Sequence, residues 1–181
     1  MEARSSQELR KVLAIILRVG NYVNHGSGGT GACAFSIETL ATTRSFKVGN
    51  MSMLQFLCVT LRRANPNFVD ELSQSLRHVP AAAREKSVDL QSSIHAFLHE
   101  VEFAQKEVSA QPASEGAATL LTNLSSETAD IQDASGKAFR ACKDLLQFFC
   151  TAEEPYECFF LHLSDFVASF RKAWKDGLAA S

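Results

Sequence analysis

The stretch Ile15–Ile37 reads IILRVGNYVNHGSGGTGACAFSI and decides how the chain folds. It opens with apolar residues at helical spacing, passes through a glycine-rich segment and resumes an apolar pattern at Phe35. Gly20 has no side chain and so permits close approach on one helix face. Asn21 and Asn24 place carboxamides, which both donate and accept hydrogen bonds, where the helix ends and its last carbonyls lack partners. The stretch therefore predicts a helix, a tight bend and a second helix.

The composition is that of a globular chain, because 46% of its 181 residues are hydrophobic and 21% are charged. We expect one domain or part of a larger one. Eighteen Lys and Arg stand against twenty Asp and Glu, for a net charge of -2. That balance lacks the global positive field that attracts nucleic acid or anionic membranes, so we expect neither as a partner.

The cysteines and the apolar runs indicate where the protein works. Five cysteines form no CxxC pair, and the odd number argues against a disulfide framework. The apolar run Val12–Leu17 is interrupted by Arg18, and no cleavage site of small residues follows it. No stretch reaches the roughly 20 apolar residues that span a bilayer. We therefore expect a cytoplasmic, unanchored protein.

Helical periodicity runs along the whole chain and strand alternation is nearly absent, which predicts an all-α fold. Residues 1–79 are expected to form a compact cluster of helices. Ser5 and Glu8 have the spacing of a capping box for the first helix. Further helices are expected over about 35–46 and 51–64.

Proline marks two more helix starts. Asn65–Pro66 reads as an N-cap followed by proline at the first helical position. Val79–Pro80 marks another restart, and the apolar pattern changes there.

Residues 80–152 show the 3.5-residue repeat of a coiled-coil seam, twice over. Pro112 and Gly116 bracket the turn between the two seams. The helices must then run antiparallel, as a hairpin about 50 Å long at 1.5 Å per residue. The first seam consists of Ala83, Ser87, Leu90, Ile94, Phe97, Val101, Ala104 and Val108. The second consists of Ala117, Leu121, Leu124, Thr128, Ile131, Ser135, Ala138, Cys142, Leu145 and Phe149.

The last segment, residues 153–181, predicts a helix with a strongly aromatic stripe. Its apolar positions recur at helical spacing and are too many to leave in water. We expect this helix to pack back on the cluster or on the base of the hairpin. The stripe consists of Phe159, Leu163, Phe166, Phe170 and Trp174.

Several patterns that suggest chemistry have plainer explanations. Residues 26–31 satisfy G-x-G-x-x-G, but they follow a helix and no βαβ unit surrounds them, so a bend is favoured over a dinucleotide site. His95 and His99 have metal-ligand spacing without a third ligand, and a solvated helix face is favoured. Cys142 lies on a seam, where a buried structural thiol is the default. We expect no catalytic residue, no cofactor, no metal and no enzyme activity.

Several short motifs occur in one order along almost the whole chain. The first is Gly20-Asn21-Tyr22-Val23-Asn24, followed after the glycine-rich segment by the pattern A/G-F-x-I/L at 34–37. Lys47 and the sequence MLQFL at 53–57 follow, the latter similar to a Leu-Leu-His-Phe-Leu motif. Residues 143–174 resemble a closing coiled coil and final helix. Together these motifs resemble the formin homology two domain, the actin-assembling part of formins.

The resemblance covers the C-terminal half of that domain, which consists of a compact part called the post and an antiparallel coiled coil. It implies a head-to-tail homodimer in the full domain, in which an N-terminal lasso of one subunit wraps the post of the other. Lasso aromatics would occupy sockets in the post. On this chain the resemblance places those sockets at Gly20, Asn21, Tyr22, Asn24 and Phe35.

The resemblance also implies actin as a partner, filament nucleation and elongation at barbed ends, and a cytoskeletal location. Arg44 and Lys47 are the candidate actin contacts, although by themselves they are equally consistent with an ordinary solvated surface. Ser36 stands where the family carries a lysine thought to face actin, and Ala34 replaces a glycine. Because the lasso, linker and knob lie outside the matched half, we expect a fragment that is inactive alone.

Two other classes of function stay open. A helical scaffold or cytoskeletal interaction domain without actin activity fits the same helices. An enzyme is the third reading, and a deep polar pocket would support it.

Overall fold

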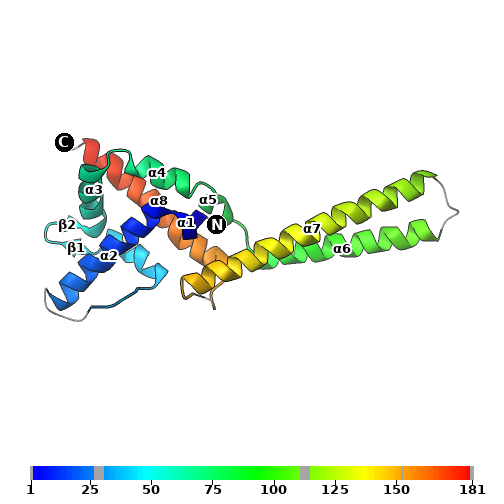
Figure 1. Ribbon diagram of the computed structural model, residues 1–181, viewed down its shortest axis with the longest axis horizontal. Coiled ribbons are helices and arrows are strands. Elements are labelled where there is room, and N and C mark those ends of the chain that lie inside the picture. The colour runs from blue at the N-terminus through cyan, green and yellow to red at the C-terminus, as the bar shows by residue number, and fades with distance from the viewer. Residues whose placement is uncertain (1, 27–30, 111–114, 152, 180–181) are drawn as a thin grey trace. The chain divides into compact units, whose positions relative to one another are not determined.

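The computed structural model describes residues 2–26, 31–110, 115–151 and 153–179 and is almost entirely helical, which confirms the all-α prediction. The chain divides into two compact units. Unit 1 combines the residues up to Arg84 with those from Leu145 onward, and unit 2 is Glu85–Asp144. Figure 1 shows the elements of both. No helix in the described ranges joins the length and the apolarity that crossing a membrane requires.

Unit 1 begins with a short helix, α1 (Glu2–Ser5), and a long one, α2 (Gln7–His25). The cap between them is Ser6, whose Oγ accepts a hydrogen bond from the Leu9 N–H at 3.0 Å. The prediction of Ser5 as the cap was wrong by one residue, because Ser5 instead ends the preceding helical turn. Ser6 is buried and its Oγ also lies 2.8 Å from Ser75 Oγ, which ties the start of α2 to a distant helix.

The segment after the glycine-rich bend is less regular than the predicted helix over 35–46. It forms a 3-10 helix, η1 (Ile37–Arg44), and then two very short strands, β1 (Lys47–Val48) and β2 (Met51–Ser52). The strands pair antiparallel, with Lys47 opposite Ser52. Strands of two residues carry no readable alternation, which is why the sequence did not reveal them.

The helix α3 (Met53–Ala64) starts two residues later than predicted and carries a capping box of Ser52 and Gln55. Asn65 ends this helix, donating its N–H to Leu61 O at 2.8 Å, so the prediction that it caps the next helix was wrong. Its Oδ1 also accepts the Asn67 N–H at 2.9 Å, the local turn that asparagine favours.

Two short helices complete this part of unit 1. The helix α4 (Phe68–Ser75) follows the Asn65 turn, and α5 (Val79–Ala82) follows α4. Pro80 lies in the first turn of α5, as predicted. Residues 79–84 belong to unit 1, and α5 packs against the last helix of the chain.

That last helix, α8 (Tyr156–Ala179), holds unit 1 together. It packs against η1, α3, α4 and α5, which confirms that it folds back on the helical cluster (Figure 1). All five residues of the predicted stripe are buried. Phe170 lies at the centre of the stripe. The centroid of its ring lies 6.3 Å from that of Phe68, 6.0 Å from that of Phe166 and 5.7 Å from that of Trp174.

Unit 2 is a pair of helices, α6 (Ser87–Ser109) and α7 (Glu115–Phe148), the latter contributing its residues up to Asp144. The two run side by side and antiparallel (Figure 1), and Gln105 Nε2 donates to Ser125 Oγ at 3.3 Å. The helix α6 has 23 residues, about 35 Å at 1.5 Å per residue, so the paired length is shorter than the predicted 50 Å.

The seam of unit 2 is only partly buried. Val101 is buried, most other seam positions are half-buried, and three are exposed. Gly116 lies in the first turn of α7, and the predicted turn residue Pro112 lies outside the described residues. Small and polar seam residues such as Thr128 and Ser135 bury little apolar area even where they are half-buried. The exposed seam residues are Leu90, Ile131 and Ala138.

Candidate functional site

A cavity of about 260 Å³ lies beside the C-terminal half of α2. Gly20, Asn21 and Asn24 line it from α2, and Phe35 lines it from the segment that follows the bend. The opposite wall comes from η1 and from the residues around the small strand pair. The structure therefore brings four of the five predicted socket residues to one concave surface.

The fifth residue, Tyr22, does not line the cavity. Its side chain is 68% exposed, because position 22 lies on a different face of α2 from Gly20, Asn21 and Asn24. Phe35 is half-buried, with the cavity beside it.

Asn21 fixes the chain segment that returns after the glycine-rich bend. Its Nδ2 donates to Ala32 O at 2.8 Å, and its Oδ1 accepts the Ala32 N–H at 2.9 Å. Both hydrogen bonds of this side chain therefore go to the backbone of one residue, Ala32. The sequence had suggested the last carbonyls of α2 as its partners instead. Residues 27–30 of the glycine-rich segment, where the sequence predicts a bend, lie outside the described residues.

Gly31 must be a glycine for this pairing to form. A Cβ atom added there would lie 2.4 Å from Asn21 Cγ, far inside van der Waals contact. Gly20 is the opposite case, because a Cβ there meets nothing within 4 Å. The close approach expected at Gly20 is thus not made within the described chain, and the space above it stays open toward the cavity.

The η1 wall is apolar in character despite its threonines. Thr42 Oγ1 donates to Thr39 O at 2.8 Å, and Thr43 Oγ1 donates to Leu40 O at 2.7 Å. Thr42 and Thr43 thus use their hydroxyls within their own helical turn, and Thr39 is the third threonine that lines this side. Sequence reasoning missed these threonines, because no periodic signal marks a 3-10 helix.

The two predicted actin contacts lie close together in the chain, at the end of η1 and in β1. Arg44 and Lys47 are both exposed, and neither forms an ion pair within the described ranges. They are therefore available to a partner.

The predictions about histidines and cysteines can be compared with the described residues. No group of three or more His, Cys, Asp or Glu among them is placed to hold a metal ion, and His95 and His99 are exposed. Burial raises the pKa of the Cys58 thiol to about 12 and outweighs the opposing effect of Arg62. Burial also raises the pKa of Cys142. Both thiols therefore stay protonated near neutral pH and are poor nucleophiles.

Comparison with known protein families shows which family the chain belongs to. The family described as Formin Homology 2 Domain matches residues 1–171. The chain belongs to this family. The match to the formin homology 2 (FH2) domain confirms the family that the order of the motifs suggested.

Three curated relatives illustrate the match, and two of them are named formin-like proteins. The chain is 34% identical over 113 residues to Disheveled-associated activator of morphogenesis 2 of Homo sapiens, covering 57% of this chain and 10% of that protein. It is 24% identical over 184 residues to Formin-like protein 14 of Arabidopsis thaliana, covering 96% of this chain and 15% of that protein. It is 25% identical over 187 residues to Formin-like protein 19 of the same plant, covering 98% of this chain and 40% of that protein. The FH2 chain thus spans less than half the length of each of these relatives.

The Asn21 pairing predicts a coupled effect on stability. Asn21→Ala and Gly31→Ala each abolish the same two hydrogen bonds, so each is expected to lower the free energy of unfolding by about 1 kcal/mol. The double variant is expected to lose about as much as either single one, which a urea-denaturation double-mutant cycle measures. Asn24→Ala, at an exposed position, is the control and is expected to change stability by less than about 0.5 kcal/mol. Additive losses from Asn21→Ala and Gly31→Ala would contradict the pairing.

Proposed function

We propose that this chain is the post and coiled-coil part of an FH2 domain whose parent protein binds actin, nucleates filaments and stays with their barbed ends. The observation that carries the proposal is the FH2 match over residues 1–171, together with a cavity at the motif residues themselves. The chain would act in the cytoskeleton as a binding and assembly module, with no covalent chemistry.

The cavity is proposed to receive an aromatic side chain from the lasso of a second subunit. Its wall combines the ring of Phe35, the threonine methyl groups of η1 and the open space above Gly20. The Asn21 pairing holds the Ala32 segment in place, so the wall exists before a partner arrives. Aromatic anchors in preformed pockets commonly dominate interface energetics.

The actin contact is proposed to involve Arg44 and Lys47. Both cations are exposed and unpaired within the described ranges, as a contact to an acidic protein surface requires. Ser36, which precedes η1 and is exposed, brings no charge to the place where the family carries a lysine. That departure favours the second candidate, a helical scaffold that lacks actin activity.

The aromatic socket predicts a selective effect of filling the space above Gly20. N-acetyltryptophanamide, used as a probe, is expected to shift the amide NMR signals of Gly20, Asn24 and Phe35 in the 181-residue chain. Gly20→Leu is expected to abolish those shifts without unfolding the chain, because its Cβ meets nothing within 4 Å.

Gly116→Leu is the matched control for this experiment, since it is a helical glycine with equally open surroundings outside the cavity. It is expected to leave the probe-induced shifts unchanged. Shifts that survive Gly20→Leu, or that both variants abolish, would contradict the socket.

Charge reversal tests the actin contact in the full-length parent. Arg44→Glu with Lys47→Glu is expected to lower actin nucleation, measured by pyrene-actin assembly, at least about tenfold, because repulsion replaces attraction at an acidic surface. Arg140→Glu with Lys143→Glu makes the same charge change on α7 and is expected to have little effect.

The same assay separates the two candidate functions. A parent protein that shows no nucleation and no filament co-sedimentation before any substitution would favour the scaffold. Strong nucleation by residues 1–181 alone would contradict the view that the activity needs the lasso and knob.

A further inference from the structure

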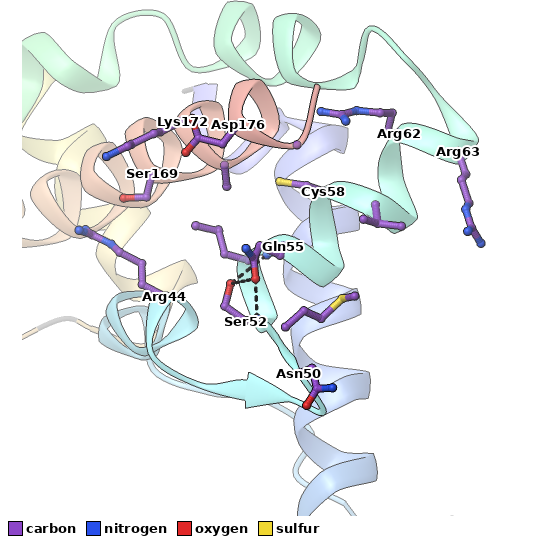
Figure 2. Close-up of a pocket in the computed structure, with 15 residues that line it drawn as sticks. Arg44, Asn50, Ser52, Gln55, Cys58, Arg62, Arg63, Ser169, Lys172 and Asp176 are labelled. Carbon is purple, nitrogen blue, oxygen red and sulfur yellow. Dashed lines mark hydrogen bonds between the residues drawn. The ribbon is translucent and has the colours of Figure 1, made fainter. Parts of the chain in front are cut away.

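A second and larger concavity, of about 840 Å³, lies between α3 and α8 in unit 1. We name it the α3–α8 groove (Figure 2). Leu54 and Cys58 of α3 and Ala173 of α8 give it an apolar lining. It is separate from the cavity beside α2, and Arg44 is the only residue of the proposed actin contact that it includes.

Positive charge gathers on this groove although the whole chain has a net charge of -2. Four cations line it, Arg44, Arg62, Arg63 and Lys172, against one carboxylate, Asp176. None of these five forms an ion pair with another described residue. The charges therefore act on whatever enters the groove instead of neutralising one another.

The cations stand at two separate sides. Figure 2 shows Arg44 and Lys172 on one side and Arg62 with Arg63 on the other, with Cys58 and Gln55 between them. A ligand that satisfies both sides must be long enough to reach across the residues between them, which a single small anion is not.

One of the four cations is held rigidly. The Arg62 guanidinium carbon lies 4.7 Å from the centroid of the Trp174 ring, and Nη2 donates to the Trp174 carbonyl oxygen. Its Nε is buried without a hydrogen-bond partner in the described part of the chain. The Arg62 charge is thus partly desolvated and not matched by a carboxylate, which strengthens its attraction for an anion.

The groove also leaves apolar side chains in contact with water. Met51 is 40% exposed and Val59 is 44% exposed, and both belong to its lining. Exposed apolar groups beside cations fit a partner that supplies apolar side chains and carboxylates together.

The start of α3 does not offer a ready cradle for phosphate. The Gln55 N–H donates to Ser52 Oγ at 3.2 Å, and the Met53 N–H donates to Phe46 O at 2.8 Å. Because these backbone donors are already used, recognition at this groove falls to the side chains. That favours a peptide with distributed carboxylates over a phosphate group.

We propose that the α3–α8 groove binds an acidic amphipathic segment of a partner protein. Its apolar side chains contact Met51, Val59 and the lining between them, and its carboxylates pair with Arg63 and Lys172 at the two sides. This activity goes beyond the proposed function, since it requires neither actin nor a second FH2 subunit.

The test uses the 181-residue chain and a short synthetic amphipathic helix, with glutamates near both ends and leucine and phenylalanine between them. Fluorescence anisotropy is expected to show saturable binding that weakens as salt rises. Arg63→Glu with Lys172→Glu is expected to weaken binding at least about tenfold. Both side chains are exposed, so folding is expected to persist, which circular dichroism checks. Arg44 stays unchanged, so the result does not depend on the actin contact.

Three controls make the outcome decisive. A peptide with glutamines in place of the glutamates, and one with alanines in place of the apolar residues, are each expected to bind at least about tenfold more weakly. Arg140→Glu with Lys143→Glu is expected to leave affinity unchanged. The proposal would be overturned if the glutamine or alanine peptide bound as tightly as the acidic peptide, or if the α7 control variant lost as much affinity as Arg63→Glu with Lys172→Glu. Binding of inositol hexakisphosphate without binding of the acidic peptide would also overturn it.

Discussion

The burial of the aromatic stripe of α8 is the interaction on which the rest of unit 1 depends. Phe159, Phe166, Phe170 and Trp174 are all nearly inaccessible to water, and they come from one helix near the end of the chain. Their partners lie on η1, α3, α4 and α5, about a hundred residues earlier. Burying each large apolar side chain is worth about 1.5–3 kcal/mol, so this stripe outweighs any of the local caps and turns.

Both candidate binding surfaces rest on that packing. The helix η1 forms one wall of the cavity beside α2, and α8 supports η1 from the core side. The α3–α8 groove has α8 itself as a wall, and the ring of Trp174 holds Arg62 at its edge. A rigid aromatic core thus positions side chains on two different surfaces, one suited to an aromatic anchor and the other to an acidic segment.

The sequence predicted the features that rest on long, repeated patterns. The stripe of α8, the antiparallel pair α6 and α7 and the proline in the first turn of α5 all follow from periodicity or from proline's fixed geometry. Four of the five predicted socket residues line one cavity, and the binding of a lasso there stays a prediction.

Features that depend on one hydrogen bond or on distant contacts could not be predicted. Ser5 and Ser6 are chemically equal as caps, and the choice of Ser6 follows from its contact with Ser75. The Asn21 side chain turns to Ala32 because Gly31 lets the backbone come close, which spacing alone does not reveal. The α3–α8 groove assembles residues from η1, α3 and α8, and no linear motif joins them.

The most direct test of this account is the stability of Phe170→Ala. Trp174 is the single tryptophan of the chain and lies 5.7 Å from the Phe170 ring, so its fluorescence during urea unfolding reports on the core of unit 1. We expect Phe170→Ala to lower the free energy of unfolding by about 3–5 kcal/mol. Leu161→Ala, on the exposed side of α8, is expected to cost less than about 1 kcal/mol. Equally small losses in the two variants would contradict the central role of the stripe.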